Sequence, residues 1–345
     1  MNSPSTGDAD LDRRIAELLD AAISERNPDG RNNNRDQLRR IMTQAVLMAT
    51  DGADRLDLKI AASALQEMRD SYLMFRPHRH RQKVTIFGSA RTKETDPLYD
   101  ATRRVAAAFA ARGWMVVTGA GPGLMSAGLE GAGRQNALGV TIRLPFEEGQ
   151  NGFVFDDHLV SMKYFFTRKL ALIRESQGFV VMPGGFGTLD ESFELLTLLQ
   201  TGKAEPVPIV LVGLGQGYWR AWQQFVDTVI EQGYVNPSDR RLYRITEDID
   251  IAVDEIVGFY RNYHSIRWEG SDLIVRLQRA PGTARLDGLN REFGDLVERG
   301  RIVVTVPTAA EIADDEVIAL PRLRLTPSRR APGRLRDLID AVNLW

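Results

Sequence analysis

The stretch "WMVVTGAGPG", residues 114–123, decides the fold, because an apolar run rich in valine ends there in three alternating glycines. The amphipathic stretch "LMSAGLEGAGRQNA" (124–137) follows, and a further apolar run, "GVTIRL" (139–144), comes after it. A strand, a glycine turn, a helix and a second strand make up the β-α-β unit of a parallel sheet. The sequence therefore predicts parallel strands with helices packed on their faces.

The same alternation continues on both sides of this unit. Further strands are expected at "VTIFGSA" (84–90), "FVVMPG" (179–184) and "PIVLVG" (208–213), each followed by an amphipathic helix, and "LYRITED" with "IAVDEIVGFYRNY" closes the series. This pattern predicts an α/β fold, a Rossmann-like doubly wound parallel sheet, over residues 81–265. Ligands of such sheets bind beyond the carboxyl ends of the strands.

Two other segments flank this predicted domain. Residues 1–80 read as a polar tail followed by helices, the last two of them broken near Asp51-Gly52. Residues 266–345 read as β-α-β-β-α, a small α+β module with no catalytic cluster. We expect this C-terminal module to act in regulation or oligomerisation.

Composition excludes several classes of protein. The 345 residues carry a net charge of −2, with 43% hydrophobic and 26% charged residues, so nothing global favours nucleic acid or a membrane surface as partner. No cysteine and only four histidines are present, which argues against disulfides, thiolate nucleophiles and a metal centre, and fits a reducing cytoplasm. No apolar run reaches the roughly 20 residues that cross a bilayer. We expect no metal and no cofactor.

The glycine turn "VTGAGPGLM" (117–125) is the first candidate for binding chemistry. Gly119, Gly121 and Gly123 permit positive φ and close approach of a ligand at a helix N-terminus. A nicotinamide site is disfavoured, because the spacing is G-x-G-x-G, the turn follows the second strand, and "GVTIRL" lacks the acidic residue expected at a ribose. A plain tight turn stays open as the alternative. Ser89, in "FGSAR" (87–91), is either a ligand donor or a polar strand end.

A second glycine turn, "PGGFGTLDE" (183–191), has the form of an anion site. The turn residues Gly184, Gly185, Gly187 and Thr188 place backbone N–H groups at a helix start, where a phosphate is favoured. Thr188 to Glu191 also fits the S/T-x-x-E capping box, in which Glu191 has only a structural role. If a phosphate binds, Glu191 must point elsewhere, towards the neutral part of the same ligand.

Arg168 and Lys169 form a third candidate, in "KYFFTRKLALIRES" (163–176), a helix that is apolar nearly all round. One interpretation is that both cations extend from a core helix to solvent. The other is that a cation is held against a cleft, as the partner of Glu191 or of a ligand anion.

These motifs together resemble the LONELY GUY (LOG) family of cytokinin riboside 5'-monophosphate phosphoribohydrolases, often mislabelled lysine decarboxylases. "PGGFGTLDE" matches its P-G-G-x-G-T-x-x-E element, "FFTRK" its helical Arg-Lys element and "TGAGPGLM" its glycine turn. "FFTRK" is similar to the longer bacterial branch of the family. The resemblance covers roughly residues 81–230.

The resemblance implies hydrolysis of the N-glycosidic bond of a nucleoside 5'-monophosphate. It implies that Glu191 and Arg168 are catalytic and that Gly184, Gly185, Gly187 and Thr188 hold the 5'-phosphate. It also implies that a wider set of residues lines the nucleotide pocket, namely Ser89, Gly119, Gly121, Gly123, Lys169, Glu147 and Asn151, the last two from "LPFEEGQN" (144–151). Members are typically dimers or larger, so the resemblance also implies a homo-oligomer.

One rival hypothesis belongs to a different class, a nucleotide or cofactor carrier or sensor without catalysis. The same fold serves such proteins, and fold alone does not set function. The pair of Arg168 and Glu191 favours the enzyme, since a protein that only binds its ligand has no need of it. A lysine decarboxylase finds no support, because no pyridoxal phosphate site is identifiable.

Overall fold

The computed structural model describes residues 5–24, 34–143, 151–215, 217–314, 316–328 and 332–345. By their contacts the residues fall into two units, one up to Gln66 and one from Glu67 to Trp345. Among the described residues, no helix is both long and apolar enough to cross a membrane.

The first unit is helical, as the sequence predicts. Its helices are α1 (Ala9–Ser24), α2 (Arg35–Thr50) and the greater part of α3 (Arg55–Phe75). The break between α2 and α3 falls where Gly52 has a φ of 74°, a left-handed conformation that glycine adopts without strain.

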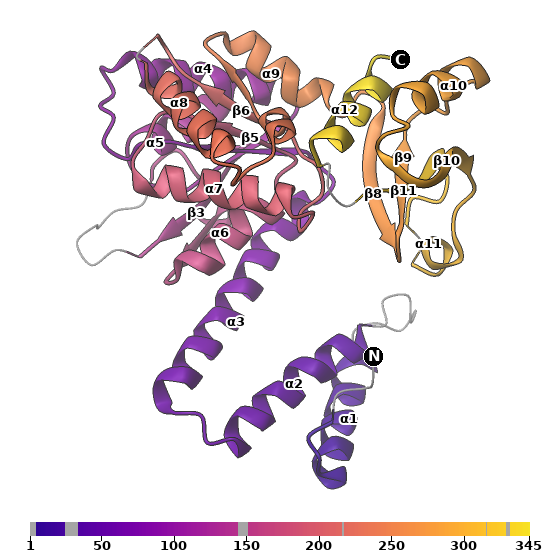
Figure 1. Ribbon diagram of the computed structural model, residues 1–345. Helices are drawn as coiled ribbons and strands as arrows, with labels where there is room; N and C mark the ends of the chain where they lie inside the picture. The colour runs from indigo at the N-terminus through magenta and orange to yellow at the C-terminus, as the bar shows by residue number, and fades with distance from the viewer. Residues whose placement is uncertain (1–4, 25–33, 144–150, 216, 315, 329–331) are drawn as a thin grey trace. The chain divides into compact units, whose positions relative to one another are not determined.

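A parallel sheet forms the centre of the second unit, in the order β4-β3-β2-β1-β5-β6-β7 (Figure 1). The described strands are β1 (Lys83–Phe87), β2 (Met115–Thr118), β3 (Ala137–Ile142), β4 (Leu159–Met162), β5 (Gly178–Val181), β6 (Ile209–Val212) and β7 (Arg244–Thr246). The chain runs outwards from β1 to β4 and then returns to place β5 on the other side of β1. The topological switch point therefore lies between β1 and β5.

Helices cover both faces of this sheet (Figure 1). They are α4 (Pro97–Ala111), α5 (Leu124–Ala132), α6 (Phe165–Arg174), α7 (Phe186–Gln200), α8 (Tyr218–Glu231) and α9 (Ile249–Gly258), with short 3-10 turns η1 (Arg76–His78), η2 (Asp156–His158) and η3 (Pro237–Leu242). Side chains alternate along each strand, so Val84 and Ile86 pack with α4, α5 and α9, whereas Phe87 packs with α6, α7 and α8. The predicted Rossmann-like fold is thereby confirmed. The edge strand β4 was not predicted, because four residues with one exposed side chain give too short a pattern.

The C-terminal module is built on a separate antiparallel sheet in the order β10-β11-β9-β8. Its elements are β8 (Tyr263–Glu269), β9 (Asp272–Leu277), α10 (Thr283–Glu292), β10 (Val297–Thr305), α11 (Ala309–Ala313), β11 (Arg322–Pro327) and α12 (Pro332–Asn343). Strand β8 was not predicted, and it begins before residue 266. In its sequence, "YHSIRWE", the apolar residues Tyr263, Ile266 and Trp268 are unevenly spaced, which breaks the two-residue period of a strand.

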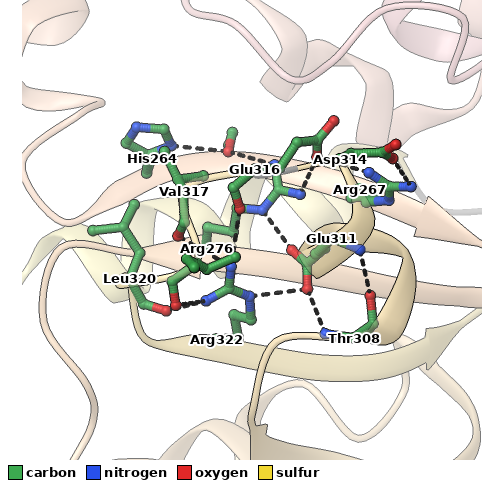
Figure 2. A network of polar contacts seen from close by, with 12 residues as sticks. His264, Arg267, Arg276, Thr308, Glu311, Asp314, Glu316, Val317, Leu320 and Arg322 are labelled. Atoms are coloured by element: carbon green, nitrogen blue, oxygen red, sulfur yellow. Dashed lines mark hydrogen bonds and ion pairs between the residues drawn. The ribbon is translucent and has the colours of Figure 1, made fainter. Parts of the chain in front are cut away.

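Buried charges tie the segment around α11 to this sheet. Glu311 accepts hydrogen bonds from Arg276 (2.7 Å) and Arg322 (3.0 Å), and all three side chains are at most 6% exposed. Figure 2 shows Glu311 between the two guanidinium groups, with Thr308 bonded to the same carboxylate. Arg322 also donates to the backbone carbonyls of Val317 and Leu320. A buried guanidinium group thus pairs with carbonyls of residues 316–320, which the structure describes as turn and irregular backbone.

Candidate active site

Three turns meet at the switch point of the parallel sheet. The backbone N–H of Ser89, in the turn after β1, donates to the carbonyl of Pro183 after β5 (3.2 Å). The carbonyl of Ser89 accepts from the N–H of Leu124, the first residue of α5 (2.9 Å). Ser89 therefore connects the two glycine turns through its backbone, while its hydroxyl accepts from the N–H of Arg91 (3.1 Å).

The glycines after β2 make room for their neighbours. A Cβ on Gly119 would lie 1.9 Å from Nη2 of Arg168. Gly123 has a φ of 66°, and a Cβ there would lie 2.4 Å from the carbonyl oxygen of Ser89. A Cβ on Gly121 would lie 2.7 Å from a side-chain carbon of Met125. Glycine is therefore required at these positions by packing, because a side chain would overlap the guanidinium group of Arg168, the side chain of Met125 or the turn after β1.

The turn after β5 has a tight side and an open side. A Cβ on Gly184 would lie 2.2 Å from the hydroxyl of buried Thr188, whereas a Cβ on Gly185 or Gly187 would meet nothing within 4 Å. Space is therefore available beside the first turn of α7. Because the first N–H groups of a helix lack partners within it, this space lies where an anion is favoured.

The capping-box interpretation of Thr188 and Glu191 is wrong. Helix α7 begins at Phe186 with Gly185 as N-cap and no side-chain cap, so Thr188 is already the third helical residue. Two adjacent glycines allow the chain to enter the helix earlier than the S/T-x-x-E pattern suggests. Glu191 is therefore released from a capping role and projects from the second turn of α7.

Tyr218 is a site residue that the sequence analysis missed. Its hydroxyl donates to the carbonyl of Gly184 (2.7 Å) and so holds the turn from the side of α8. The position of Tyr218 in the sequence could have indicated this contact. Tyr218 follows β6, which pairs in parallel with β5, and the carboxyl ends of parallel strands lie at the same edge of the sheet.

Arg168 points into the sheet edge and not to solvent. Its side chain is 8% exposed, Nε donates to the carbonyl of Val140 (2.9 Å), and Nη2 donates to that of Gly119 (3.3 Å). The interpretation that Arg168 extends to solvent is therefore wrong. A guanidinium group bound to two carbonyls keeps its full positive charge at this edge of the sheet.

Lys169 has a different environment from Arg168. Its ammonium group forms ion pairs with Asp190 (3.2 Å) and Glu194 (2.6 Å) on α7. The hydrogen bond with Glu194, the ion pair with Asp190 and their charges raise the pKa of Lys169, although burial opposes them. Asp190, the first of the two carboxylates behind the glycine turn, thus joins α7 to α6.

Glu191, the second of these carboxylates, is half-buried and titrates near neutrality. Burial raises the pKa of Glu191 to about 7, the charges of Arg168 and Lys169 oppose this, and those of Asp190 and Glu194 reinforce it. A carboxyl group with such a pKa, beside a buried guanidinium group at the carboxyl ends of the strands, is typical of a general acid or base.

The remaining predicted residues come from the segment before η2. The amide of Asn151 donates to the carbonyl of Gly121 (3.5 Å), which brings Asn151 to the glycine turn after β2. Glu147 lies outside the described residues. Within the described part of the chain, no group of three histidine, cysteine, aspartate or glutamate residues is placed to hold a metal ion.

Sheet order and site together define the class of protein: a Rossmann-like α/β protein with an acid–guanidinium site at its switch point. Residues 123–256 match the family model described as "possible lysine decarboxylase". The chain is 29% identical over 218 residues to a probable cytokinin riboside 5'-monophosphate phosphoribohydrolase of Oryza sativa subsp. japonica, covering 60% of this chain and 99% of that protein. It is 26% identical to a cytokinin riboside 5'-monophosphate phosphoribohydrolase of Arabidopsis thaliana, over 47% of this chain and 71% of that one.

These matches confirm the resemblance to the LONELY GUY family that the motifs predicted. Among solved structures, the Moco carrier protein of Chlamydomonas reinhardtii is similar, at 19% identity and a TM-score of 0.37, over 51% of this chain and 98% of that one. No functional conclusion follows from a similarity of that size.

Proposed function

We propose that the protein hydrolyses the N-glycosidic bond of a nucleoside 5'-monophosphate to give a free base and ribose 5-phosphate. The observation that carries this proposal is Glu191, with a pKa of about 7, one turn beyond a helix N-terminus with open space beside it. The names of the rice and Arabidopsis relatives support the same reaction.

The reaction assigns a task to each part of the site. The N–H groups at Gly187 and Thr188 bind the 5'-phosphate, and the sugar then extends along α7 towards Glu191. Breaking the bond from C1' to the base develops positive charge on the sugar, which an ionised Glu191 stabilises. Glu191 accepts a proton from the attacking water, whose oxygen bonds to C1'. Arg168 stabilises the electron pair that leaves with the base. The base takes up a proton from solvent, and Glu191 returns its proton to solvent, so that the sum is water plus nucleotide to base plus ribose 5-phosphate.

The test is a panel of substrates. The purified protein is incubated with AMP, GMP, IMP, CMP, UMP and a cytokinin riboside monophosphate, and base and ribose 5-phosphate are separated by chromatography. Release that disappears in Glu191→Gln supports the hydrolase. Binding by calorimetry without release from any monophosphate supports the carrier or sensor instead.

A decarboxylase is disfavoured by the state of Lys169. A lysine that forms a Schiff base needs a lowered pKa, whereas the ion pairs with Glu194 and Asp190 raise the pKa of Lys169.

The rate is expected to depend on pH through Glu191. Because the ionised carboxylate is the active form, kcat/KM should rise about tenfold per pH unit below pH 7 and level off above it. Rates are measured from pH 5.5 to 9. The substrate phosphate also ionises in this range, with a second pKa of about 6. The affinity for ribose 5-phosphate, measured by calorimetry over the same range, shows how much of the pH dependence comes from the phosphate and not from Glu191. A flat profile across pH 6–8 contradicts the assignment.

Gly119→Ala is expected to lower kcat about 100-fold without removing any reacting group. Its Cβ would overlap Nη2 of Arg168 at 1.9 Å, so the guanidinium group must move. Gly282→Ala is the matched control, since a Cβ there meets nothing within 4 Å. Equal kcat values for the two variants would show that the reaction does not need Arg168 in this position.

We also propose a homo-oligomer, at least a dimer, and a cytoplasmic location. Exposed aromatic side chains on α6 and α7 support the first, since Phe165, Phe166 and Phe186 are 55%, 53% and 92% exposed. The absence of cysteine supports the second. Light scattering of the purified chain measures the oligomeric state.

A further inference from the structure

Helix α3 extends into the second unit, which begins at Glu67, and provides a buried carboxylate there. Glu67, near the end of α3, is 4% exposed. It accepts hydrogen bonds from the backbone N–H of Lys163 (2.8 Å), the backbone N–H of Tyr164 (3.4 Å) and the hydroxyl of Thr167 (2.6 Å). These three donors lie at the start of α6.

Helix α6 lacks a cap of its own. Its N-cap residue is Tyr164, which makes no side-chain capping bond. The N–H of this N-cap residue is one of the groups that a helix start leaves unpaired, and Glu67 accepts from it. A carboxylate at this position also interacts favourably with the helix dipole. Glu67 therefore supplies from α3 the cap that the sequence before α6 does not provide.

The capped turn is the one that carries Arg168. Thr167, which bonds to Glu67, precedes Arg168 directly, and the N–H of Arg168 donates to the carbonyl of Tyr164 (3.2 Å). The guanidinium end is fixed separately by Val140 and Gly119. Arg168 is thus held at both ends, and its backbone end depends on Glu67.

We propose that Glu67 is a positioning residue of the active site, which caps α6 and thereby fixes Arg168. The proposal rests on the proposed function for its kinetic test. It gives part of the N-terminal extension a task in catalysis, although that extension lies outside the segment that carries the family motifs.

The test compares Glu67→Ala, Glu67→Gln and Asp70→Ala. Asp70 lies on the same helix, 42% exposed and paired with Arg69, and serves as control. For Glu67→Ala we expect kcat to fall 10- to 100-fold, on the order of the effect of a 1 Å misplacement, with KM changed less than threefold because the phosphate turn is untouched. Glu67→Gln keeps one acceptor oxygen, so its kcat should lie between that of the wild type and that of Glu67→Ala. Asp70→Ala should match the wild type.

A second readout separates positioning from general loss of structure. The charges that act on Glu191 are Arg168 and Lys169, which lower its pKa, and Asp190 and Glu194, which raise it. If Arg168 moves away, the acid limb of the pH–rate profile shifts to higher pH. A variant that only unfolds in part has a lower rate at every pH, and the acid limb of its pH–rate profile stays at the wild-type position.

Hydrogen exchange at Lys163 and Tyr164 tests the cap independently of any activity. Faster exchange in Glu67→Ala with lower kcat and a shifted limb supports the proposal. Unchanged exchange overturns it, and so does faster exchange with unchanged kcat. If the wild type releases no base, the proposed function fails by itself, and exchange across residues 163–168 still decides whether Glu67 holds this turn.

Discussion

Glu191→Gln is expected to lower kcat for hydrolysis of a nucleoside monophosphate by about 10²–10⁴-fold, the usual contribution of general acid–base catalysis. Glutamine keeps the size of the side chain but can neither accept the water proton nor place negative charge near C1'. The affinity for ribose 5-phosphate should change little, because the N–H groups of the α7 turn remain. Single-turnover base release and calorimetry measure the two quantities.

The same substitution should make the free protein more stable at alkaline pH. The pKa of Glu191 is raised from 4.5 to about 7 on folding. Stability is therefore highest when Glu191 is protonated and falls as the pH rises from 4.5 through 7. Because the side chain is half-buried, we expect about 1–3 kcal/mol of stabilisation of Glu191→Gln at pH 8 and none at pH 4. Equal unfolding midpoints at pH 8 would contradict the raised pKa.

Much of the candidate site could be predicted because its chemistry lies in local patterns. Glycine turns at strand ends are visible in a few consecutive letters, whereas the Thr188 to Glu191 spacing suggests a capping box that α7 does not have. The sequence does not predict the direction of Arg168, because a pattern that is apolar nearly all round the helix does not show which cation faces the sheet. The structure decides it through Gly119, whose missing side chain provides the space.

Residues that act across long distances in the chain were missed. Glu67 lies about a hundred residues before the helix it caps, and a lone glutamate on an amphipathic helix looks like any exposed one. Tyr218 was missed for the same reason, since its partner is a backbone carbonyl of another turn. Strand β8 was missed because its apolar residues, Tyr263, Ile266 and Trp268, do not keep the two-residue period of a strand.

Glu311→Ala is expected to destabilise the C-terminal module by about 3–5 kcal/mol, the usual cost of removing one partner of a buried ion pair. Arg276 and Arg322 would keep their charges at 6% and 0% exposure without the carboxylate between them. Asp314→Ala is the control, because Asp314 is 54% exposed and its pair with Arg267 should contribute less than about 1 kcal/mol. Hydrogen exchange of β9 and β11 measures the difference, and similar exchange in the two variants would contradict it.

The effect of Glu311→Ala should diminish in acid. Burial acts to raise the pKa of Glu311, but hydrogen bonds from Thr308, Arg276 and Arg322 hold it below its ordinary value of 4.5. A carboxylate with a lowered pKa stabilises the fold above pH 4.5, and this contribution is lost as the pH falls through the folded value. Wild type and variant should therefore converge in stability well below pH 4.

The same variant tests the proposed role of the module without deleting residues. Helix α7 begins at the glycine turn after β5. Its last residues, Leu199 and Gln200, line a cavity of about 960 Å³ whose other wall includes Trp268 of the module. Gln200 also donates to Asp239 of η3 (2.7 Å), and η3 packs on α12.

If the module regulates the site, its destabilisation in Glu311→Ala should alter α7 and change kcat, whereas Asp314→Ala should leave kcat unchanged. If it serves assembly, the mass in solution should fall instead. Wild-type kcat and wild-type mass in a variant with a loosened module would exclude both roles.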